Sequence, residues 1–311
     1  IMVAYLRQKY GVRKIAIVDT DVHHGDGTQD IFYHDPDTLY ISFHQDGRTL
    51  YPGTGFPNEA GSPAALGTNI NLPLLPGTGD EGVHRLFDGI IRPILDDFEP
   101  EIIINSAGQD NHFSDPLASM SVTAQGYARL ADKLKADIAV LEGGYSVEAA
   151  LPYVNTGIIL AMAEMDYSNV IEPDQTGLRK QDEKCNARVD ELIRQIGDLW
   201  TNRQKLSSDA LAKCGESWSR RKNIYYDEEG ISEEQVETAH YCKQCNGYLT
   251  IQTAAENTRF GSQSAFIVIV DQCTCQACRQ KAYDEALKKK KTGKWQHVFV
   301  QDKSQGNIEN I

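Results

Sequence analysis

The residues of this sequence that could do chemistry are densest between positions 14 and 28, which read KIAIVDTDVHHGDGT. Asp19, Asp21 and His23 alternate at the end of an apolar run, so on an extended chain they project to the same side. Two carboxylates and one imidazole, without sulfur, are a typical ligand set for a divalent metal ion. The alternative is a strand that ends in a polar, glycine-rich turn with solvated side chains. The crowding of ionisable groups at one strand end favours the metal site.

Strands and helical patterns alternate along the first half of the chain. Short apolar runs predict buried strands at residues 15–18, 38–43, 101–105 and 138–141. Helical spacing of apolar residues occurs at 2–10, 30–34, 80–98, 121–135 and 147–163, and Pro93 should kink the third of these helices. This alternation predicts the α/β class, with a parallel sheet and helices on both of its faces. Residues 45–79 are interpreted as a long functional loop.

Unusual polar residues follow the carboxyl ends of the predicted strands. His44 follows the second run, Asp110 follows the third after a turn of small residues, and Glu142 and Tyr145 follow the fourth. Ligands bind at this edge of open α/β sheets. We therefore expect these side chains to meet the cluster at the end of the first strand.

Asp110 is the simplest third ligand for a metal ion held by Asp21 and His23. Three protein ligands leave one coordination position open for water, as in catalytic zinc sites. Such a cation lowers the pKa of bound water and polarises a carbonyl group. Tyr145 follows two glycines and could donate a hydrogen bond to the oxyanion that forms, and a tyrosine of the hydrophobic core is an equal alternative.

Four segments within residues 1–164 resemble one enzyme family. They are D-x-D-x-H-H-G-D-G, Y-P-G-T-G, S-A-G-x-D and E-G-G-Y, in this order. Together they resemble the histone deacetylase/acetylpolyamine amidohydrolase family of the arginase–deacetylase superfamily. The resemblance implies an arginase-like α/β fold, one catalytic Zn²⁺, and hydrolysis of an N-acetyl or acyl amide on a lysine or a polyamine. It favours one metal over the two of arginases, because Gly25 stands where arginases carry a further aspartate.

By motif position, the resemblance assigns Asp21, His23 and Asp110 to the metal and Tyr145 to the transition state. The residues that it implies for the substrate tunnel are Tyr51, Gly108 and Leu117. The residues that it implies for a structural monovalent cation, K⁺, are Asp19, Asp21, His23, Ser42 and Phe43. Some polyamine-specific relatives carry a glutamate where this chain has Leu117. The resemblance therefore favours an acyl-lysine or a small acetylated amine as substrate.

One element of the family pattern is missing from this sequence. Family members carry a pair of adjacent histidines upstream as general base and electrostatic partner, and Asp19 and Asp26 correspond to the carboxylates that orient them. No histidine precedes His23. We expect a poor catalyst as written, and we consider an N-terminally truncated deacetylase, one subunit of a split deacetylase, and a non-catalytic scaffold that binds metal and partners. The retained carboxylates and Ile1 at the first position favour truncation.

The composition argues against several classes of protein. The 311 residues carry a formal net charge of −13, which argues against wholesale binding to nucleic acid. No apolar run approaches the roughly 18 residues of a membrane span, and the first residues lack the apolar core of a signal peptide. Seven cysteines without such a signal indicate a reducing compartment, and we expect a cytoplasmic protein.

The composition changes after residue 165, which we take as the end of the deacetylase-like domain. Residues 166–231 are expected to form a linker and an amphipathic helix at 183–206. A capping-box pattern at 232–235 predicts the start of a short helix. Residues 232–300 are expected to form a zinc-ribbon-like domain, and residues 301–311 a disordered tail.

Two cysteine pairs predict a metal site in that second domain. Cys242 and Cys245 precede two predicted strands, at 248–253 and 265–270, and Cys275 and Cys278 follow them. Four thiolates in this pattern are typical of a structural Zn²⁺. Cys273 is an alternative to Cys275, and a redox dithiol is the alternative to zinc.

A basic run at residues 288–291 ends a predicted helix over 279–291. Cations suit the C-terminus of a helix because of its dipole, so a solvated helix end is the simplest interpretation. Contact with nucleic acid or an acidic partner is the alternative.

Overall fold

The computed structural model describes the whole chain except residues 179, 227–228 and 260. It contains two compact units, the first formed by Ile1–Gly61 and Ala65–Lys205 and the second by Ser62–Ala64 and Leu206–Ile311. The segment predicted as a linker includes residues 179 and 227–228, which lie outside the described residues. Among the described helices, none combines the length and the apolar character that crossing a bilayer requires.

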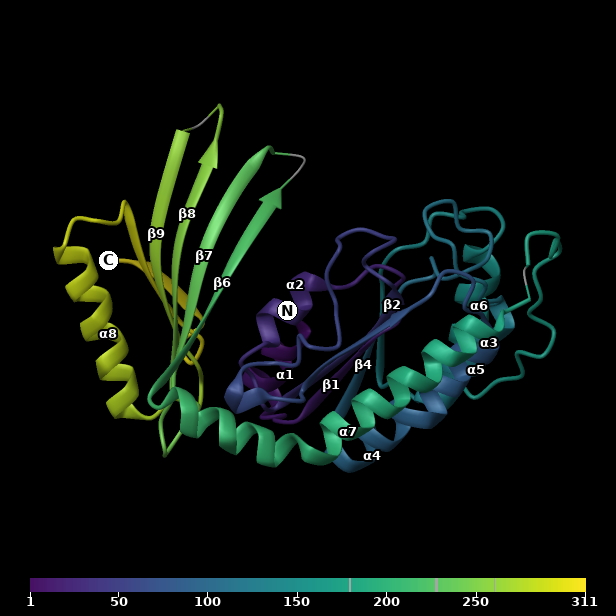
Figure 1. The fold of residues 1–311 in the computed structure, drawn as a ribbon, viewed down its shortest axis with the longest axis horizontal. Helices are drawn as coiled ribbons and strands as arrows, with labels where there is room; N and C mark the ends of the chain where they lie inside the picture. Colours follow the sequence, from purple (N-terminus) through teal and green to yellow (C-terminus); the bar gives the residue numbers. More distant parts are fainter. Residues whose placement is uncertain (179, 227–228, 260) are drawn as a thin grey trace. The chain divides into compact units, whose positions relative to one another are not determined.

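The first unit is built on a five-stranded parallel sheet of order β3-β2-β1-β4-β5. Figure 1 labels three of these strands, β1, β2 and β4. Its strands are β1 (Ile15–Asp19), β2 (Thr38–Gln45), β3 (Asn69–Leu74), β4 (Ile102–Ala107) and β5 (Ile138–Leu141). The sequence predicted all of these except β3, which lies in the segment interpreted as a loop. Pro73 argued against a strand here, because proline cannot donate a hydrogen bond to a neighbouring strand and occurs in sheets mainly on edge strands such as β3.

Six helices of the first unit follow the pattern read from the sequence, with one difference. They are α1 (Met2–Tyr10), α2 (Asp26–Phe32), α3 (Asp80–Leu86), α4 (Arg92–Phe98), α5 (Ala124–Leu134) and α6 (Leu151–Met162). The single helix predicted over 80–98 is divided into α3 and α4 by a π-helical turn, Phe87–Ile91. Pro93 lies in the first turn of α4, and the helical backbone continues into it from the π-helical turn through Ile91 and Arg92. The seventh helix, α7 (Glu183–Cys214), begins in the first unit and ends in the second.

Both faces of this sheet are covered. Alternate residues of β1 belong to different hydrophobic clusters, with Ala16 and Val18 in one and Ile15 and Ile17 in the other. The larger cluster includes buried side chains of α3 to α7, and the smaller one includes Val3 of α1. The predicted α/β fold is therefore confirmed, and the carboxyl ends of β1, β2 and β4 meet at one edge of the sheet.

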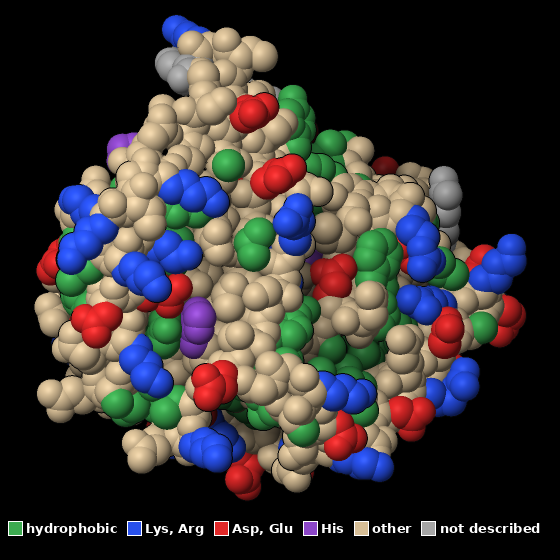
Figure 2. All heavy atoms as spheres, turned by 60° about the vertical axis from the view of Figure 1, so that its left-hand side comes forward, with side chains coloured by type: hydrophobic (Ala, Val, Ile, Leu, Met, Phe, Trp, Pro, Cys, Tyr) green, Lys and Arg blue, Asp and Glu red, His purple; other side chains and the backbone are tan. Residues whose placement is uncertain are grey.

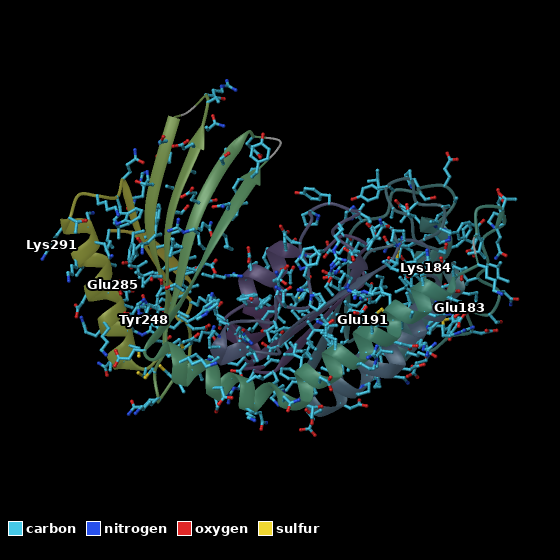
Figure 3. All side chains as sticks on the ribbon, in the orientation of Figure 1. Glu183, Lys184, Glu191, Tyr248, Glu285 and Lys291 are labelled. Carbon is cyan, nitrogen blue, oxygen red and sulfur yellow. The ribbon has the colours of Figure 1, made fainter. Side chains whose placement is uncertain are left out.

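The second unit is a six-stranded sheet of order β11-β10-β9-β8-β7-β6 with one helix packed on it. Its elements are β6 (Ser217–Tyr226), β7 (Ile231–His240), β8 (Tyr248–Asn257), β9 (Gly261–Val270), α8 (Gln276–Lys291), β10 (His297–Asp302) and β11 (Asn307–Asn310). Ala282 and Ala286 of α8 pack against a cluster that includes Phe266 and Val298. The Tyr248 hydroxyl donates a hydrogen bond of 3.0 Å to Glu285 of α8 (Figure 3).

Two predictions for the second unit are wrong. Residues 232–235, expected to open a helix, lie in β7, because ten residues of that strand pair with β6 and with β8. These ladders outweigh a local capping-box pattern. Residues 301–311 are not disordered throughout, since β10 extends to Asp302 and β11 pairs with it in antiparallel fashion. The described sheet is thus larger than the two strands expected between the cysteine pairs, and its cysteine cluster is compatible with a zinc-ribbon-like unit.

Phe266 should be a main support of the second unit, because it is fully buried under α8. We expect Phe266→Ala to lower the free energy of unfolding by about 3–5 kcal/mol. Urea unfolding of this variant measures the loss. Tyr225→Ala, on the same sheet but 65% exposed, is the matched control and should change stability by less than about 1 kcal/mol. Equal losses in the two variants would contradict this placement of the core.

Candidate metal and active site

The structure brings together the three predicted metal ligands at the carboxyl edge of the first sheet. Nδ1 of His23 lies 3.1 Å from Oδ1 of Asp21 and 3.2 Å from Oδ2 of Asp110. One ligand atom from each of the three residues lies within 4.8 Å of the others. Asp21 follows β1 and Asp110 follows β4, and these two strands are paired in parallel, so their ends carry both carboxylates to one place.

Backbone amides fix the orientation of the two carboxylates. The amide of Val22 donates to Oδ1 of Asp110 at 2.8 Å, and the amide of Gly143 donates to Oδ2 of Asp21 at 2.8 Å. The amide of His23 adds a 2.8 Å hydrogen bond to Oδ1 of Asp21. The loop after β5 is therefore tied directly to a candidate metal ligand.

Two glycines leave the space that the carboxylates occupy. A Cβ atom at Gly143 would lie 2.2 Å from Oδ2 of Asp110 and 2.7 Å from Oδ2 of Asp21. A Cβ atom at Gly108 would lie 2.4 Å from Oδ2 of Asp21. All three separations are shorter than van der Waals contact, so any larger residue at either position would displace the carboxylates.

The electrostatics of the three residues fit a bound cation. Burial, together with the nearby charge of Asp21, raises the pKa of Asp110 to about 6. Hydrogen bonds to Asp110 and Asp21 raise the pKa of His23 to about 10. Burial also opposes ionisation of Asp21, but its hydrogen bonds with His23 and the backbone outweigh burial and lower its pKa. Two buried carboxylates thus share one positive neighbour, His23. A divalent cation would neutralise both of their negative charges. The residues present fit a metal of the zinc type.

A hollow of about 350 Å³ opens beside these residues. The residues that line it are Asp19, Asp21, His23, His24, Gly25, Thr28, Tyr51, Pro52, Glu142, Gly143 and Tyr145. The ring of Tyr145 stands edge-on to the ring of His23, with 6.2 Å between their centroids. Oδ2 of Asp115 accepts a 2.9 Å hydrogen bond from the amide of Tyr145. Tyr145 is 46% exposed and Tyr51 is 69% exposed, so neither belongs to the core.

The two carboxylates predicted to orient catalytic histidines have different surroundings. Asp19 is buried and accepts hydrogen bonds from the Tyr40 hydroxyl at 2.8 Å and from the Asp21 amide at 3.1 Å. Burial raises the pKa of Asp19 to about 7. Asp26 is exposed in the first turn of α2, where it accepts a hydrogen bond from the amide of Gly27.

The remaining predicted site residues lie apart from the pocket lining. Leu117 is 53% exposed, and Gly108 packs behind Asp21. Of the residues predicted for a monovalent cation, Ser42 pairs with Asp19 in the sheet register, and its hydroxyl contacts Nδ1 of His44 at 2.8 Å. Phe43 is fully buried in the larger hydrophobic cluster.

Sequence reasoning missed a polar network beside the pocket. Its members are His24, Gln29, Glu59, Asn69 and Asn71. They come from α2, β3 and the segments around them, which are far apart in the sequence. The only sequence signal is the alternation of Asn69 and Asn71, which points both side chains to one side of a strand.

The second unit holds a group of four cysteines. One sulfur from each of Cys242, Cys245, Cys275 and Cys278 lies within 4.8 Å of the others. Cys275 is the N-cap of α8 and Cys278 lies in its first turn. Cys273, considered as an alternative ligand, is exposed and outside this group.

The turn after β7 shapes half of the cysteine group. The amide of Gln244 donates to the sulfur of Cys242 at 3.4 Å, and the amide of Gly247 donates to the sulfur of Cys245 at 3.3 Å. The first of these bonds, with the neighbouring Cys278 thiol, lowers the pKa of Cys242 to about 7. Gly247 has φ +74° and a Cβ there would lie 1.7 Å from the carbonyl oxygen of His240, so the turn requires glycine.

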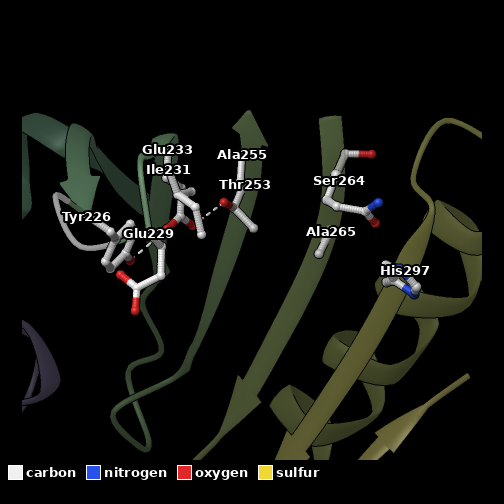
Figure 4. Close-up of a pocket in the computed structure, with 10 residues that line it drawn as sticks. Tyr226, Glu229, Ile231, Glu233, Thr253, Ala255, Ser264, Ala265 and His297 are labelled. Carbon is white, nitrogen blue, oxygen red and sulfur yellow. Dashed lines mark hydrogen bonds between the residues drawn. The ribbon is translucent and has the colours of Figure 1, made fainter. Parts of the chain in front are cut away.

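A second hollow, of about 450 Å³, lies on the sheet of the second unit (Figure 4). Its carboxylate Glu233 accepts hydrogen bonds from Tyr226 at 2.7 Å, from Gln235 at 2.7 Å and from Thr253. Burial opposes ionisation of Glu233, but these hydrogen bonds outweigh it and lower its pKa. Among the described residues, the neighbours of Glu233 therefore already satisfy this carboxylate.

Comparison with known proteins identifies the first unit. Residues 1–160 match the family model described as histone deacetylase domain. A probable deacetylase of Archaeoglobus fulgidus is 52% identical over 183 residues, which are 56% of this chain and 50% of the relative. The acetoin utilization protein AcuC of Bacillus subtilis is 36% identical over 183 residues, which are 56% of this chain and 47% of the relative. The chain thus spans about half the length of these curated relatives.

Solved structures agree with the sequence relatives. The crystal structure of the HDA15 HD domain is 29% identical, with a TM-score of 0.55 over 68% of this chain and 57% of that one. The histone deacetylase Clr3 is 20% identical, with a TM-score of 0.56 over 79% of this chain and 42% of that one, and shows the same fold. With the family match and the parallel sheet, these similarities show that the chain belongs to the histone deacetylase/acetylpolyamine amidohydrolase family.

Proposed function

We propose that this chain is the metal-binding part of a zinc-dependent deacetylase that hydrolyses an acyl-lysine or a small N-acetylated amine. The observation that carries the proposal is the convergence of Asp21, His23 and Asp110 beside an open hollow. Three protein ligands leave room for water and substrate. A bound Zn²⁺ would polarise the amide carbonyl and lower the pKa of water.

The side chains of the hollow have separate roles in this proposal. Tyr145 donates a hydrogen bond from its hydroxyl group to the carbonyl oxygen of the substrate amide, where negative charge develops. Burial and the carboxylates Asp110 and Asp21 raise the pKa of Tyr145, so its hydroxyl stays protonated at neutral pH. Tyr51 packs along the alkyl stem of the acylated amine, as its place in the lining and its exposed ring allow.

The general base is the part of the mechanism that these residues do not supply. His23 contacts both metal-site carboxylates, and among the described lining residues His24 is the one other histidine. We propose that Asp19 and Asp26 orient a histidine pair contributed from outside this sequence, by a preceding segment or by a partner chain. A metal-bearing scaffold that binds acylated ligands without hydrolysis is the second candidate, because Asp26 is exposed and faces no histidine pair in the described residues.

Two further features of the proposal concern ions and partners. We propose that K⁺ binds near the ends of β1 and β2, where Asp19 and Ser42 lie in register. We also propose a role without nucleic acid. Figure 2 shows acidic and basic side chains interspersed on one face, in keeping with the net charge of −13.

Removing Asp110 tests the metal site. We expect Asp110→Asn to bind one Zn²⁺ fewer per chain and to reduce hydrolysis of an acetyl-lysine peptide at least about 100-fold, because a ligand and its charge are lost. Zinc analysis and a peptide assay measure both effects, in this chain and in any longer form that its gene encodes. Asp96→Asn, the same change at an exposed position, is the control.

The outcomes separate the two candidate functions. Equal zinc content and equal turnover in wild type and Asp110→Asn would rule out the assigned site. Zinc bound through Asp110 with no turnover in this chain and none in any longer form would favour the scaffold.

We propose that the second unit holds a structural Zn²⁺ through Cys242, Cys245, Cys275 and Cys278. The distances between the sulfurs and the amide hydrogen bonds to two of them support four-thiolate coordination. Such an ion would tie the turn between β7 and β8 to the first turn of α8. Four protein ligands leave no position open, so its role is stability.

The cysteine site is tested by counting zinc. The double variant Cys242→Ser/Cys278→Ser should bind one Zn²⁺ fewer per chain and unfold at a lower urea concentration, because bound metal contributes folding free energy. Cys214→Ser, a cysteine of the second unit outside the group, should retain the full zinc content. Cys273→Ser should do the same, and zinc loss there with retention in Cys275→Ser would exchange the two assignments. Full zinc in the double variant would refute the site.

A further inference from the structure

The loop that carries Tyr51 into the pocket lining is held by hydrogen bonds to its backbone. Oε1 of Glu59 accepts from the amide of Gly55 at 3.1 Å and from the amide of Phe56 at 2.9 Å. The carbonyl oxygen of Gly55 contacts Nε2 of His44 at 3.0 Å. Tyr51 itself is 69% exposed, so packing of its own ring does not fix the loop.

The second oxygen of Glu59 is fixed by Gln29 of α2. Nε2 of Gln29 donates to Oε2 of Glu59 at 2.7 Å, and Gln29 is buried. Oε1 of Gln29 accepts from the side-chain amides of Asn69 and Asn71, each at 2.7 Å. The two asparagines lie on β3, so this contact connects the pair to the sheet.

The same network reaches the pocket wall through His24. Nε2 of His24 contacts Oε1 of Gln29 at 3.2 Å, and Nδ1 contacts the Thr54 hydroxyl at 2.8 Å. Gly55 has φ +85°, and a Cβ there would lie 2.6 Å from Cγ of His24. The loop backbone therefore packs directly against this ring, and His24 lines the pocket together with Tyr51.

We propose that the Gln29–Glu59 pair is a positioning device that sets where the Tyr51 wall stands against the metal, and so how well an acyl chain fits. Glu59 holds the loop and Gln29 anchors Glu59 and His24 to α2 and β3. Neither side chain lines the pocket, so both act through the residues that do. The inference rests on the proposed deacetylase function, which it deepens by naming residues that control substrate fit.

The chemistry of the pair allows a reciprocal exchange. Glu59→Gln alone places an amide N–H₂ against the N–H₂ of Gln29, or turns it toward the amides of Gly55 and Phe56. Gln29→Glu alone places two carboxylates together. In the double variant Gln29→Glu/Glu59→Gln, residue 59 donates to residue 29, and the oxygens that accept from the loop amides, the two asparagines and His24 are all restored.

A double-mutant cycle on the full chain tests the device. Hydrogen exchange of the Gly55 and Phe56 amides measures how firmly the loop is held. The affinity for an acetyl-lysine peptide measures the fit of substrate in the pocket, together with kcat and KM where turnover is present. We expect each single variant to exchange these amides at least about 10-fold faster and to bind the peptide about 5- to 10-fold more weakly, with zinc content unchanged. The double variant should recover most of both losses.

A Glu→Gln change elsewhere supplies the matched control. Glu191 lies exposed on α7 (Figure 3) and pairs with Arg188. Neither residue lines the pocket. Glu191→Gln should leave loop exchange and peptide affinity unchanged.

Three results would overturn the inference. They are unchanged exchange in the single variants, altered exchange with unaltered peptide affinity, and a double variant no better than the singles. If the wild-type chain binds no acetyl-lysine peptide, the proposed function fails, and the exchange cycle still decides whether the pair holds the loop.

Discussion

Two carboxylates buried side by side are the constraint on which the first unit depends. Asp110 is fully buried and Asp21 nearly so, and each raises the cost of ionising the other. Such a pair requires a positive neighbour, which the structure supplies as His23 and which a metal ion would supply more strongly. The parallel pairing of β1 with β4 is what brings the two carboxylates together, because both follow strands that end at the same edge. The strand pairing that builds the sheet therefore also creates the need for a positive charge between the two carboxylates.

This arrangement dictates the surrounding backbone. The amides of Val22 and Gly143 donate to the carboxylates, and Gly108 and Gly143 leave room for them, so the loops after β1, β4 and β5 are fixed by the same oxygens. Asp115 extends the arrangement by accepting from the amide of Tyr145. A larger residue at either glycine would therefore displace the carboxylates directly, and it would disturb the loops that they hold as a consequence.

The sequence predicted which residues meet at the candidate metal site, because these residues follow local patterns that can be read without the tertiary fold. Alternation placed Asp21 and His23 together, and strand order placed Asp110 beside them. Prediction from the sequence failed for residues whose hydrogen-bond partners are distant in the chain, and for segments where a local pattern disagreed with the tertiary structure. Gln29 and Glu59 belong to no motif and meet through the tertiary fold, and β3 was hidden by Pro73. In the second unit, ladders of ten residue pairs on each side of β7 outweighed a four-residue helix signal.

The two candidate metal sites differ in what their ligands leave open. Asp21 and His23 line a hollow whose other walls include the exposed rings of Tyr51 and Tyr145, and the buried Asp110 contacts His23 from outside the lining. An ion bound by these residues would therefore remain accessible to substrate. The sulfurs of the four cysteines lie within 4.8 Å of one another, and backbone amides donate to two of them. An ion held by all four would have no coordination position open. The second unit also has its own hydrophobic cluster, separate from those of the first. Loss of a Zn²⁺ bound by the cysteines should therefore disturb α8 and the β7–β8 turn and leave the carboxylate site intact.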